Sequence, residues 1–410
     1  MLVSILMNLG ATYQLQNKKK ESVNSYINAY EVGIALEHND PQYINSLIML
    51  GDLECQGSFL QTALQYYQRG LKECLKLINN LKIEYQDLTE KFQELQKQKN
   101  FQKDIKYHQI TGRQNYLEAT IRKAQISLAI LYINQGKIFA VQKKKQDSFE
   151  SINLARDIYR DLKKQSQNSL MHFNQIKSQL SSQERENEQT YLDYLQRQTN
   201  VLIGSLDSQE ALIQYSLEKD AEYAFQLLTE SDQNYKTNEN INETDFITHL
   251  VNKQKLFAKI CVDDKIKSIK IFQQNPQKFY EEIQNTMNQF NKYKTNFNIQ
   301  QQQGQKQNTS NQDEFNDLKI LKLSALFEFY GIIINNYTQQ VQDQNQTLQK
   351  LLQQYNWFNE NEQYSIETQE LIEQVLQFKQ DYQLTQDLKN LEQTLFIIRQ
   401  RQEQEATSQL

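Results

Sequence analysis

A glycine that recurs at a fixed interval, with the same kinds of neighbours each time, constrains the fold of this chain more than any other feature. Gly10 and Gly51 are 41 residues apart, and Gly136 lies 126 residues beyond Gly10, close to three such intervals. Residues at matching offsets follow each glycine: Tyr13, Ser22, Tyr26 and Ala29 in the first unit, Glu54, Ala63, Tyr67 and Gly70 in the second, and Phe139, Ser148, Ile152 and Ala155 in the third. Self-similarity of this kind is typical of repeat proteins, whose stacked units bury one continuous core. The repeat predicts a binding scaffold and does not identify the partner.

Composition and spacing predict that each unit is a pair of α-helices. The chain has 410 residues but only two prolines, and its ten glycines are too few for the many tight turns of a β-rich protein. Within each unit the small and aromatic residues are separated by steps of three and four, which places them on one helix face. The residues expected to form the packing between helices are Leu9, Gly10, Tyr13, Leu50, Gly51, Ala63, Tyr67, Gly136, Phe139 and Ala155. The predicted fold class is all-α.

The segments around the first two glycines also carry a family signature. Met7-Asn8-Leu9-Gly10-x-x-Tyr13 and Ile48-Met49-Leu50-Gly51 match the first helix of a tetratricopeptide repeat, and Ala63-x-x-x-Tyr67-x-x-Gly70-Leu71 matches its second helix. The chain resembles this family, most closely the longer repeat variant found in kinesin light chains and spindle-orientation adaptors. The match is good over residues 1–78 and fair over 117–162. The chain departs from the pattern at Glu54, where an aromatic is expected, at Ser22 and Ser148, where alanine is expected, and at Gln135, where leucine is expected.

The resemblance implies a right-handed α-solenoid whose first helices line a concave groove that receives a peptide or helix of a partner. In this chain the groove would consist of Asn8, Ala11, Gln14, Asn45, Asp52, Asn134 and Lys137. We expect Asn8, Asn45 and Asp52 to be partly exposed, and Leu9, Tyr13, Leu50 and Tyr67 to be buried. Family members that bind the C-terminal carboxylates of chaperones use a clamp of lysine and asparagine. Met7, Ala11 and Met49 stand at the clamp positions, so binding of chaperone tails is disfavoured.

The pattern along the chain predicts four regions. Residues 1–165 hold the repeats and a long antiparallel helical hairpin over about residues 60–141, where apolar residues step by three and four from Ile78 to Leu95 and from Leu117 to Ile138. Residues 166–299 are predicted to be degenerate helical repeats, with breaks at Gly204-Ser205, at 237–242 and at Asn275-Pro276. Residues 300–314 are a Gln-rich linker. Residues 315–410 are C-terminal helices with a short coiled-coil seam from Leu384 to Ile398.

Motifs for catalysis and for cofactor or metal binding are not found in the sequence. There is no glycine-rich phosphate loop, His-Glu-x-x-His helix or nucleophile elbow, so we expect no catalytic residue, cofactor or metal. His38, His108, His172 and His249 are scattered among polar stretches and are expected on the surface. A net charge of −5 gives no footprint for nucleic acid, and the most apolar stretch, 318–337, carries too many charges to span a membrane.

The sequence therefore favours a non-catalytic scaffold or adaptor that binds protein partners in a cytoplasmic or cytoskeletal assembly. The alternative is a regulatory or structural subunit of an enzyme complex whose catalytic chain is separate. We also expect a cover over the apolar residues Ile5, Leu6 and Leu9, because terminal repeats need a polar outer face. The candidates for this cover are the chain's own C-terminal helix, a second copy of the chain, a partner subunit or upstream sequence. A second copy would mean self-association, through this face or through the C-terminal seam.

Overall fold

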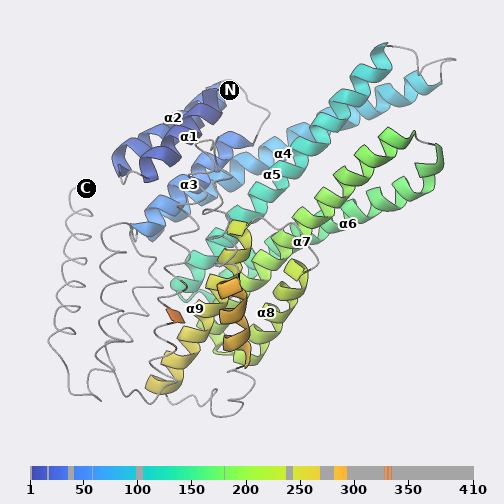
Figure 1. The fold of residues 1–410 in the computed structure, drawn as a ribbon. Helices are drawn as coiled ribbons and strands as arrows, with labels where there is room; N and C mark the ends of the chain where they lie inside the picture. Colours follow the sequence, from blue (N-terminus) through green and yellow to red (C-terminus); the bar gives the residue numbers. More distant parts are fainter. Residues whose placement is uncertain are drawn as a thin grey trace, which may run out of the picture. The chain divides into compact units, whose positions relative to one another are not determined.

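The computed structural model describes residues 2–15, 18–35, 41–57, 59–97, 105–179, 181–236, 243–267 and 281–292, together with Phe327, Tyr330, Gly331 and Ile334. These residues are helical apart from short turns and contain no strand, which confirms the all-α class (Figure 1). The chain divides into two compact units, Met1–Leu192 and Asp193–Leu410. The predicted boundary at residue 165 falls inside a helix of the first unit.

The first unit is a series of helices in which each packs on the next. The elements are α1 (Leu2–Leu15), α2 (Lys19–Ala35), α3 (Gln42–Gln56), α4 (Leu60–Gln96), α5 (Ile105–Val141) and α6 (Lys145–Ile176), followed by a 3₁₀ turn over Lys177–Gln179. Contacts also join α1 to α3 and α3 to α5, so these alternate helices are neighbours. Buried side chains such as Tyr26, Leu50 and Tyr67 belong to one core cluster that extends from α1 to α5.

The recurring glycines are points of close contact between the two helices of a pair. A Cβ atom at Gly10 would lie 2.6 Å from Cε1 of Tyr26, and one at Gly51 would lie 2.7 Å from Cδ1 of Tyr67. Real Cβ contacts are not this short, so only glycine lets the aromatic ring of the second helix lie this close to the backbone of the first. At Gly136 the same place is taken by an isoleucine, Ile152, at 3.0 Å.

A serine reinforces the same contact in two of the three pairs. The Ser22 hydroxyl donates to the carbonyl of Gly10 at 2.8 Å, and the Ser148 hydroxyl donates to the carbonyl of Gly136 at 2.8 Å. Both serines are fully buried, and the second pair has Ala63 at this position. The serines that depart from the tetratricopeptide pattern therefore satisfy a hydrogen-bonding group inside the pair instead of weakening it.

The turn between the two helices is also the same in the three pairs. In each turn a backbone N–H donates to a carbonyl five residues earlier at 2.9 Å: Lys18 to Tyr13, Phe59 to Glu54, and Lys144 to Phe139. Lys18 and Lys144 then place their ammonium groups 5.9 and 5.6 Å from the rings of Tyr13 and Phe139. Both lysines are exposed and come directly before the second helix of their pair.

The two longest neighbouring helices of this unit, α4 and α5, run antiparallel. Cys74 donates to the carbonyl of Ala124 at 3.0 Å, Arg113 pairs with Glu84 at 2.7 Å, and the rings of Phe92 and Tyr107 are 5.4 Å apart. As residues advance along α4 from Cys74 to Phe92, their partners on α5 move back from Ala124 to Tyr107, as an antiparallel pair requires. The two helices occupy the range assigned to the hairpin, 60–141.

The second unit differs from the sequence prediction at its first helix. It contains α7 (Ser182–Glu218), which begins at the end of the first unit, α8 (Ala221–Lys236) and α9 (Glu243–Lys267), and residues 281–292 are also helical. The predicted break at Gly204-Ser205 is wrong, because α7 passes through it. The chain turns instead at Lys219, whose φ of 58° is the left-handed conformation that ends helices.

Gly204 is a packing glycine instead of a turn glycine. Ser231 donates to its carbonyl at 2.6 Å, and a Cβ at Gly204 would lie 3.0 Å from the ring of Tyr235. Ser231 and Tyr235 are four residues apart, as are Ser22 and Tyr26. The glycine–serine–tyrosine contact of the first pair therefore recurs between α7 and α8, with 27 residues between glycine and serine instead of 12.

Most of the predicted C-terminal region lies outside the described residues. This applies to the linker 300–314 and to the seam from Leu384 to Ile398. Of the predicted helix 318–337, the structure describes Phe327, Tyr330, Gly331 and Ile334, which are helical. Phe327 stacks on Phe290 with ring centroids 3.9 Å apart.

Candidate interaction surface

The residues predicted to line a groove lie on α1, α3 and α5, and none of them is fully buried. Asn8 is exposed, and the others are half-buried: Ala11 and Gln14 on α1, Asn45 and Asp52 on α3, and Asn134 and Lys137 on α5. We call these seven residues the polar face. Their helices are neighbours in the first unit, so residues 126 positions apart in sequence belong to one layer of helices.

Hydrogen bonds between side chains connect the α3 and α5 parts of the polar face. Ser127 donates to Oδ1 of Asn45 at 2.9 Å, and Nδ2 of Asn134 donates to Oδ1 of Asp52 at 3.0 Å. Both bonds join residues 82 positions apart, so they fix one register between the two helices. Lys137 approaches the oxygen of Asn134 at 3.5 Å. Asp52, Asn134 and Lys137 therefore form one connected polar group.

The tyrosines that pack on the repeat glycines also form hydrogen bonds, through their hydroxyl groups, to side chains of the polar face. Tyr67 donates to Oδ1 of Asp52 at 2.5 Å, and Tyr26 donates to the amide oxygen of Gln14 at 3.3 Å. The sequence predicted Tyr67 only as a packing residue. The sequence held a signal for this second role. Tyr26 and Tyr67 each follow a glycine by 16 residues, and a polar side chain that can accept a hydrogen bond lies just after each glycine, Gln14 after Gly10 and Asp52 after Gly51.

Asp52 has an unusual electrostatic environment. Burial raises the pKa of its carboxyl group, and this effect outweighs the Tyr67 hydrogen bond and the charge of Lys137, which both act to lower it. Burial and the nearby Asp52 also raise the pKa of Tyr67. In the part of the chain that the structure describes, both bonds to Asp52 end on Oδ1, and Oδ2 has no hydrogen-bond or ion-pair partner.

The predicted burial of the packing residues is correct in the repeat around Gly51 and wrong for part of the repeat around Gly10. Leu50 and Tyr67 are each 1% exposed, but Leu9 is 39% exposed and Tyr13 is half-buried. The reason is the number of neighbours: among the described helices, α3 packs on α1, α2, α4 and α5, whereas α1 packs mainly on α2 and α3. Ile5 is 54% exposed on the same helix, so the expected cover is not found among the described residues.

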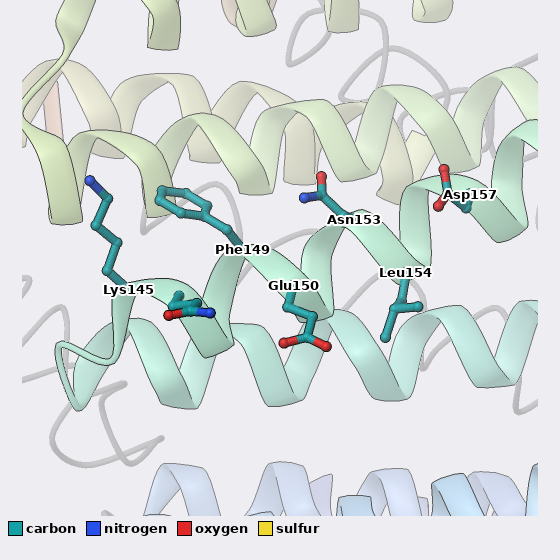
Figure 2. Close-up of a pocket in the computed structure, with 7 residues that line it drawn as sticks. Lys145, Phe149, Glu150, Asn153, Leu154 and Asp157 are labelled. Atoms are coloured by element: carbon teal, nitrogen blue, oxygen red, sulfur yellow. The ribbon is translucent and has the colours of Figure 1, made fainter.

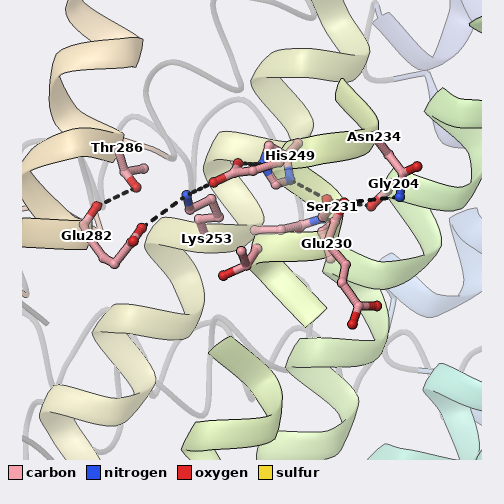
Figure 3. A network of polar contacts seen from close by, with 12 residues as sticks. Gly204, Glu230, Ser231, Asn234, His249, Lys253, Glu282 and Thr286 are labelled. Carbon is pink, nitrogen blue, oxygen red and sulfur yellow. Dashed lines mark hydrogen bonds and ion pairs between the residues drawn. The ribbon is translucent and has the colours of Figure 1, made fainter. Parts of the chain in front are cut away.

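The second unit contains a buried polar cluster that the sequence did not predict. Nε2 of His249 lies 2.6 Å from Oδ1 of Asp232, Lys253 pairs with Oδ2 of Asp232 at 2.8 Å, and Lys253 also approaches Glu282 at 3.7 Å (Figure 3). Nδ1 of His249 lies 3.0 Å from the hydroxyl of Ser231. The expectation that His249 is a surface residue is wrong: it is 1% exposed and stacks on Tyr235.

Burial dominates the electrostatics of this cluster. It lowers the pKa of His249, although Asp232 acts to raise it. Burial alone would raise the pKa of Asp232, but its bonds to His249 and Lys253 lower the pKa to about 2. The serine, histidine and aspartate resemble a catalytic set only in composition, because Ser231 is fully buried and donates its proton to Gly204. The cluster connects α7, α8 and α9 with the helical residues 281–292 through hydrogen bonds and ion pairs.

An open hollow of about 680 Å³ runs along α6 (Figure 2). Its lining residues all come from this one helix: Lys145, Gln146, Phe149, Glu150, Asn153, Leu154 and Asp157. Small-molecule sites normally enclose the ligand between several elements and aim a few polar groups at it. This hollow does neither, so the polar face is the better candidate.

Comparison of the chain with protein-family models, with curated proteins and with solved structures finds no match. None of the helices in the described ranges is long and apolar enough to cross a lipid bilayer. The same ranges hold no group of three or more His, Cys, Asp and Glu side chains that could bind a metal ion. The polar face is therefore the feature of the described residues from which a function can be inferred.

Proposed function

We propose that this protein is a non-catalytic scaffold of the tetratricopeptide type, in which a right-handed solenoid binds a segment of a partner protein on its polar face. The observation that carries the proposal is the recurrence of one helix-pair geometry at Gly10, Gly51 and Gly136, with the first helices α1, α3 and α5 as neighbours. A layer built in this way presents the same side of successive helices to a ligand.

The composition of the polar face also supports binding. Asn8, Asn45 and Asn134 are amides that can both donate and accept, which suits recognition of a peptide backbone or of polar side chains. They are at least partly accessible, and the Asp52 hydrogen bonds already order part of this surface, which reduces the entropy lost on binding. We propose a protein partner in a cytoplasmic or cytoskeletal assembly. The alternative, a subunit of an enzyme complex, would use the same surface.

Affinity purification of the full chain from cells that make it, followed by quantitative mass spectrometry, tests the proposal. The double variant Asn8→Ala/Lys137→Ala removes two side chains of the polar face. The matched control Asn28→Ala/Lys72→Ala removes the same two residue types from exposed positions of α2 and α4. We expect the amount of partner recovered to fall at least tenfold with the first variant, which corresponds to a loss of roughly 1.4 kcal/mol of binding energy. The control should recover as much partner as the wild type. Equal recovery with both variants would contradict the assignment of the surface.

A further inference from the structure

The two oxygens of the Asp52 carboxylate have different surroundings. Oδ1 accepts hydrogen bonds from Tyr67 on α4 and from Asn134 on α5, which uses the two acceptor positions of a carboxylate oxygen. Oδ2 has no partner among the described residues, and Asp52 is half-buried in the polar face. The carboxylate is thus held on one side by the protein and offers a single oxygen to a ligand.

This asymmetry restricts the chemistry of a ligand. An arginine side chain pairs best with a carboxylate through two parallel hydrogen bonds, one to each oxygen. Asp52 cannot offer that geometry, because Oδ1 is already saturated. A lysine ammonium is a compact point charge that needs only one oxygen. The half-buried carboxylate also gains more from a neighbouring cation than an exposed one would, because screening by water is reduced.

We propose that Asp52 selects partner segments that place a lysine ammonium group on its free oxygen. This inference rests on the proposed function, and it adds the chemistry of the partner: a peptide with a lysine at one fixed position, flanked by residues that contact the asparagines of the polar face. Lys137 contacts Asn134, the residue bonded to Oδ1, and its positive charge already acts on Asp52. That charge leaves room for one further cation at Oδ2 and disfavours a ligand with several adjacent basic residues.

Asp52→Asn is a close isosteric test of this idea. The side-chain oxygen of asparagine can still accept from Tyr67 and Asn134, and only the free oxygen is replaced, by an NH₂ group that donates. The fold is therefore expected to persist, which circular dichroism will verify. The control is Asp87→Asn, the same change at an exposed position of α4.

The probe is a phage-displayed library of random linear peptides, selected in parallel on the wild-type chain and on both variants. We expect a lysine enriched at one position on the wild type and on Asp87→Asn, and not on Asp52→Asn. Peptides selected without a lysine preference, or with the same preference on Asp52→Asn, would overturn this inference and leave the proposed function intact. A library that yields no peptide for any of the three proteins would overturn the proposed function itself.

A titration with one selected peptide supplies the quantitative test. Fluorescence polarisation should show binding to the wild type weakened about tenfold when the lysine is replaced by glutamine, as expected for loss of one charge-assisted hydrogen bond. The same replacement should have no effect on binding to Asp52→Asn, and arginine should bind less well than lysine. An equal loss on both proteins would show that the lysine is bound elsewhere.

Discussion

Replacing Gly51 with alanine should destabilise the first unit, although alanine is the better helix former. The new methyl carbon would lie 2.7 Å from Cδ1 of Tyr67, well inside the normal contact distance. Tyr67 is 1% exposed, and its hydroxyl is bonded to Asp52, so its ring has no free space to move into. The two helices of the pair must therefore separate or the ring must leave its place.

The size of the effect follows from two opposing contributions. Overpacking of a rigid core site costs up to about 3 kcal/mol, and the change from glycine to alanine inside a helix returns about 1 kcal/mol. The net loss is therefore roughly 2 kcal/mol, which corresponds to a fall in Tm of about 4–8 °C for a unit of this size. Gly112→Ala in α5 is the matched control, because a Cβ there has no neighbour within 4 Å. It should gain up to about 1 kcal/mol from helix propensity alone.

Thermal unfolding followed by circular dichroism at 222 nm, together with urea titration, measures both variants. Gly136→Ala should fall between them, because its new contacts, Cδ1 of Ile152 at 3.0 Å and the backbone oxygen of Ser148 at 3.2 Å, are longer than those at Gly51. The expected order of stability is Gly112→Ala, then Gly136→Ala, then Gly51→Ala. If Gly51→Ala proves as stable as Gly112→Ala, the close glycine–tyrosine contact does not exist and the repeat geometry is wrong.

Three further results are expected. Burial raises the pKa of Asp52, so the folded chain holds this proton more tightly than the unfolded chain. The wild type should therefore lose stability as pH rises from below about 4, whereas Asp52→Asn has no proton to lose. Urea titrations should show Asp52→Asn gaining stability relative to the wild type as pH rises, and no difference between the two in acid. Because burial lowers the pKa of His249, hydrogen exchange in α8 and α9, corrected for intrinsic rates, should report full stability above about pH 6.5 and a loss as pH falls through the folded pKa. His249→Gln should abolish that dependence, and an unchanged profile would contradict it. Ser148→Ala should cost about 1 kcal/mol in urea titrations, as expected for one net hydrogen bond, whereas no change would show that the carbonyl of Gly136 does not need this donor.

The parts of the fold that depend on local contacts could be predicted from the sequence. The glycine and the aromatic residue of a repeat are 16 positions apart and meet across a short turn, so their spacing alone indicates a helix pair. The same pattern predicts that Leu50 and Tyr67 are buried. They are buried because α3 has neighbouring helices on both sides. Asn45 and Asp52 were also expected to be partly exposed, because polar residues on the opposite side of the same helix do not face its partner.

The remaining features depend on contacts that are distant in sequence. The break predicted at Gly204-Ser205 is wrong because Gly204 packs against a serine 27 residues away instead of 12, a distance that the first repeat does not indicate. His249 was expected on the surface because its sequence neighbours are polar, yet Asp232 and Lys253 compensate each other's charges in the interior. Leu9 was expected to be buried by analogy with Leu50, but burial depends on how many helices surround a position.

Photo-crosslinking reports directly whether the polar face binds the partner, which no stability measurement can do. A benzophenone amino acid in place of Asn8 would report what lies against α1, and the same amino acid in place of Asn28, exposed on α2, is the matched control. If the partner lies on the polar face, a covalent adduct to it forms from position 8 and none forms from position 28. Adducts from position 28 alone would contradict it and move the binding surface to the second helices.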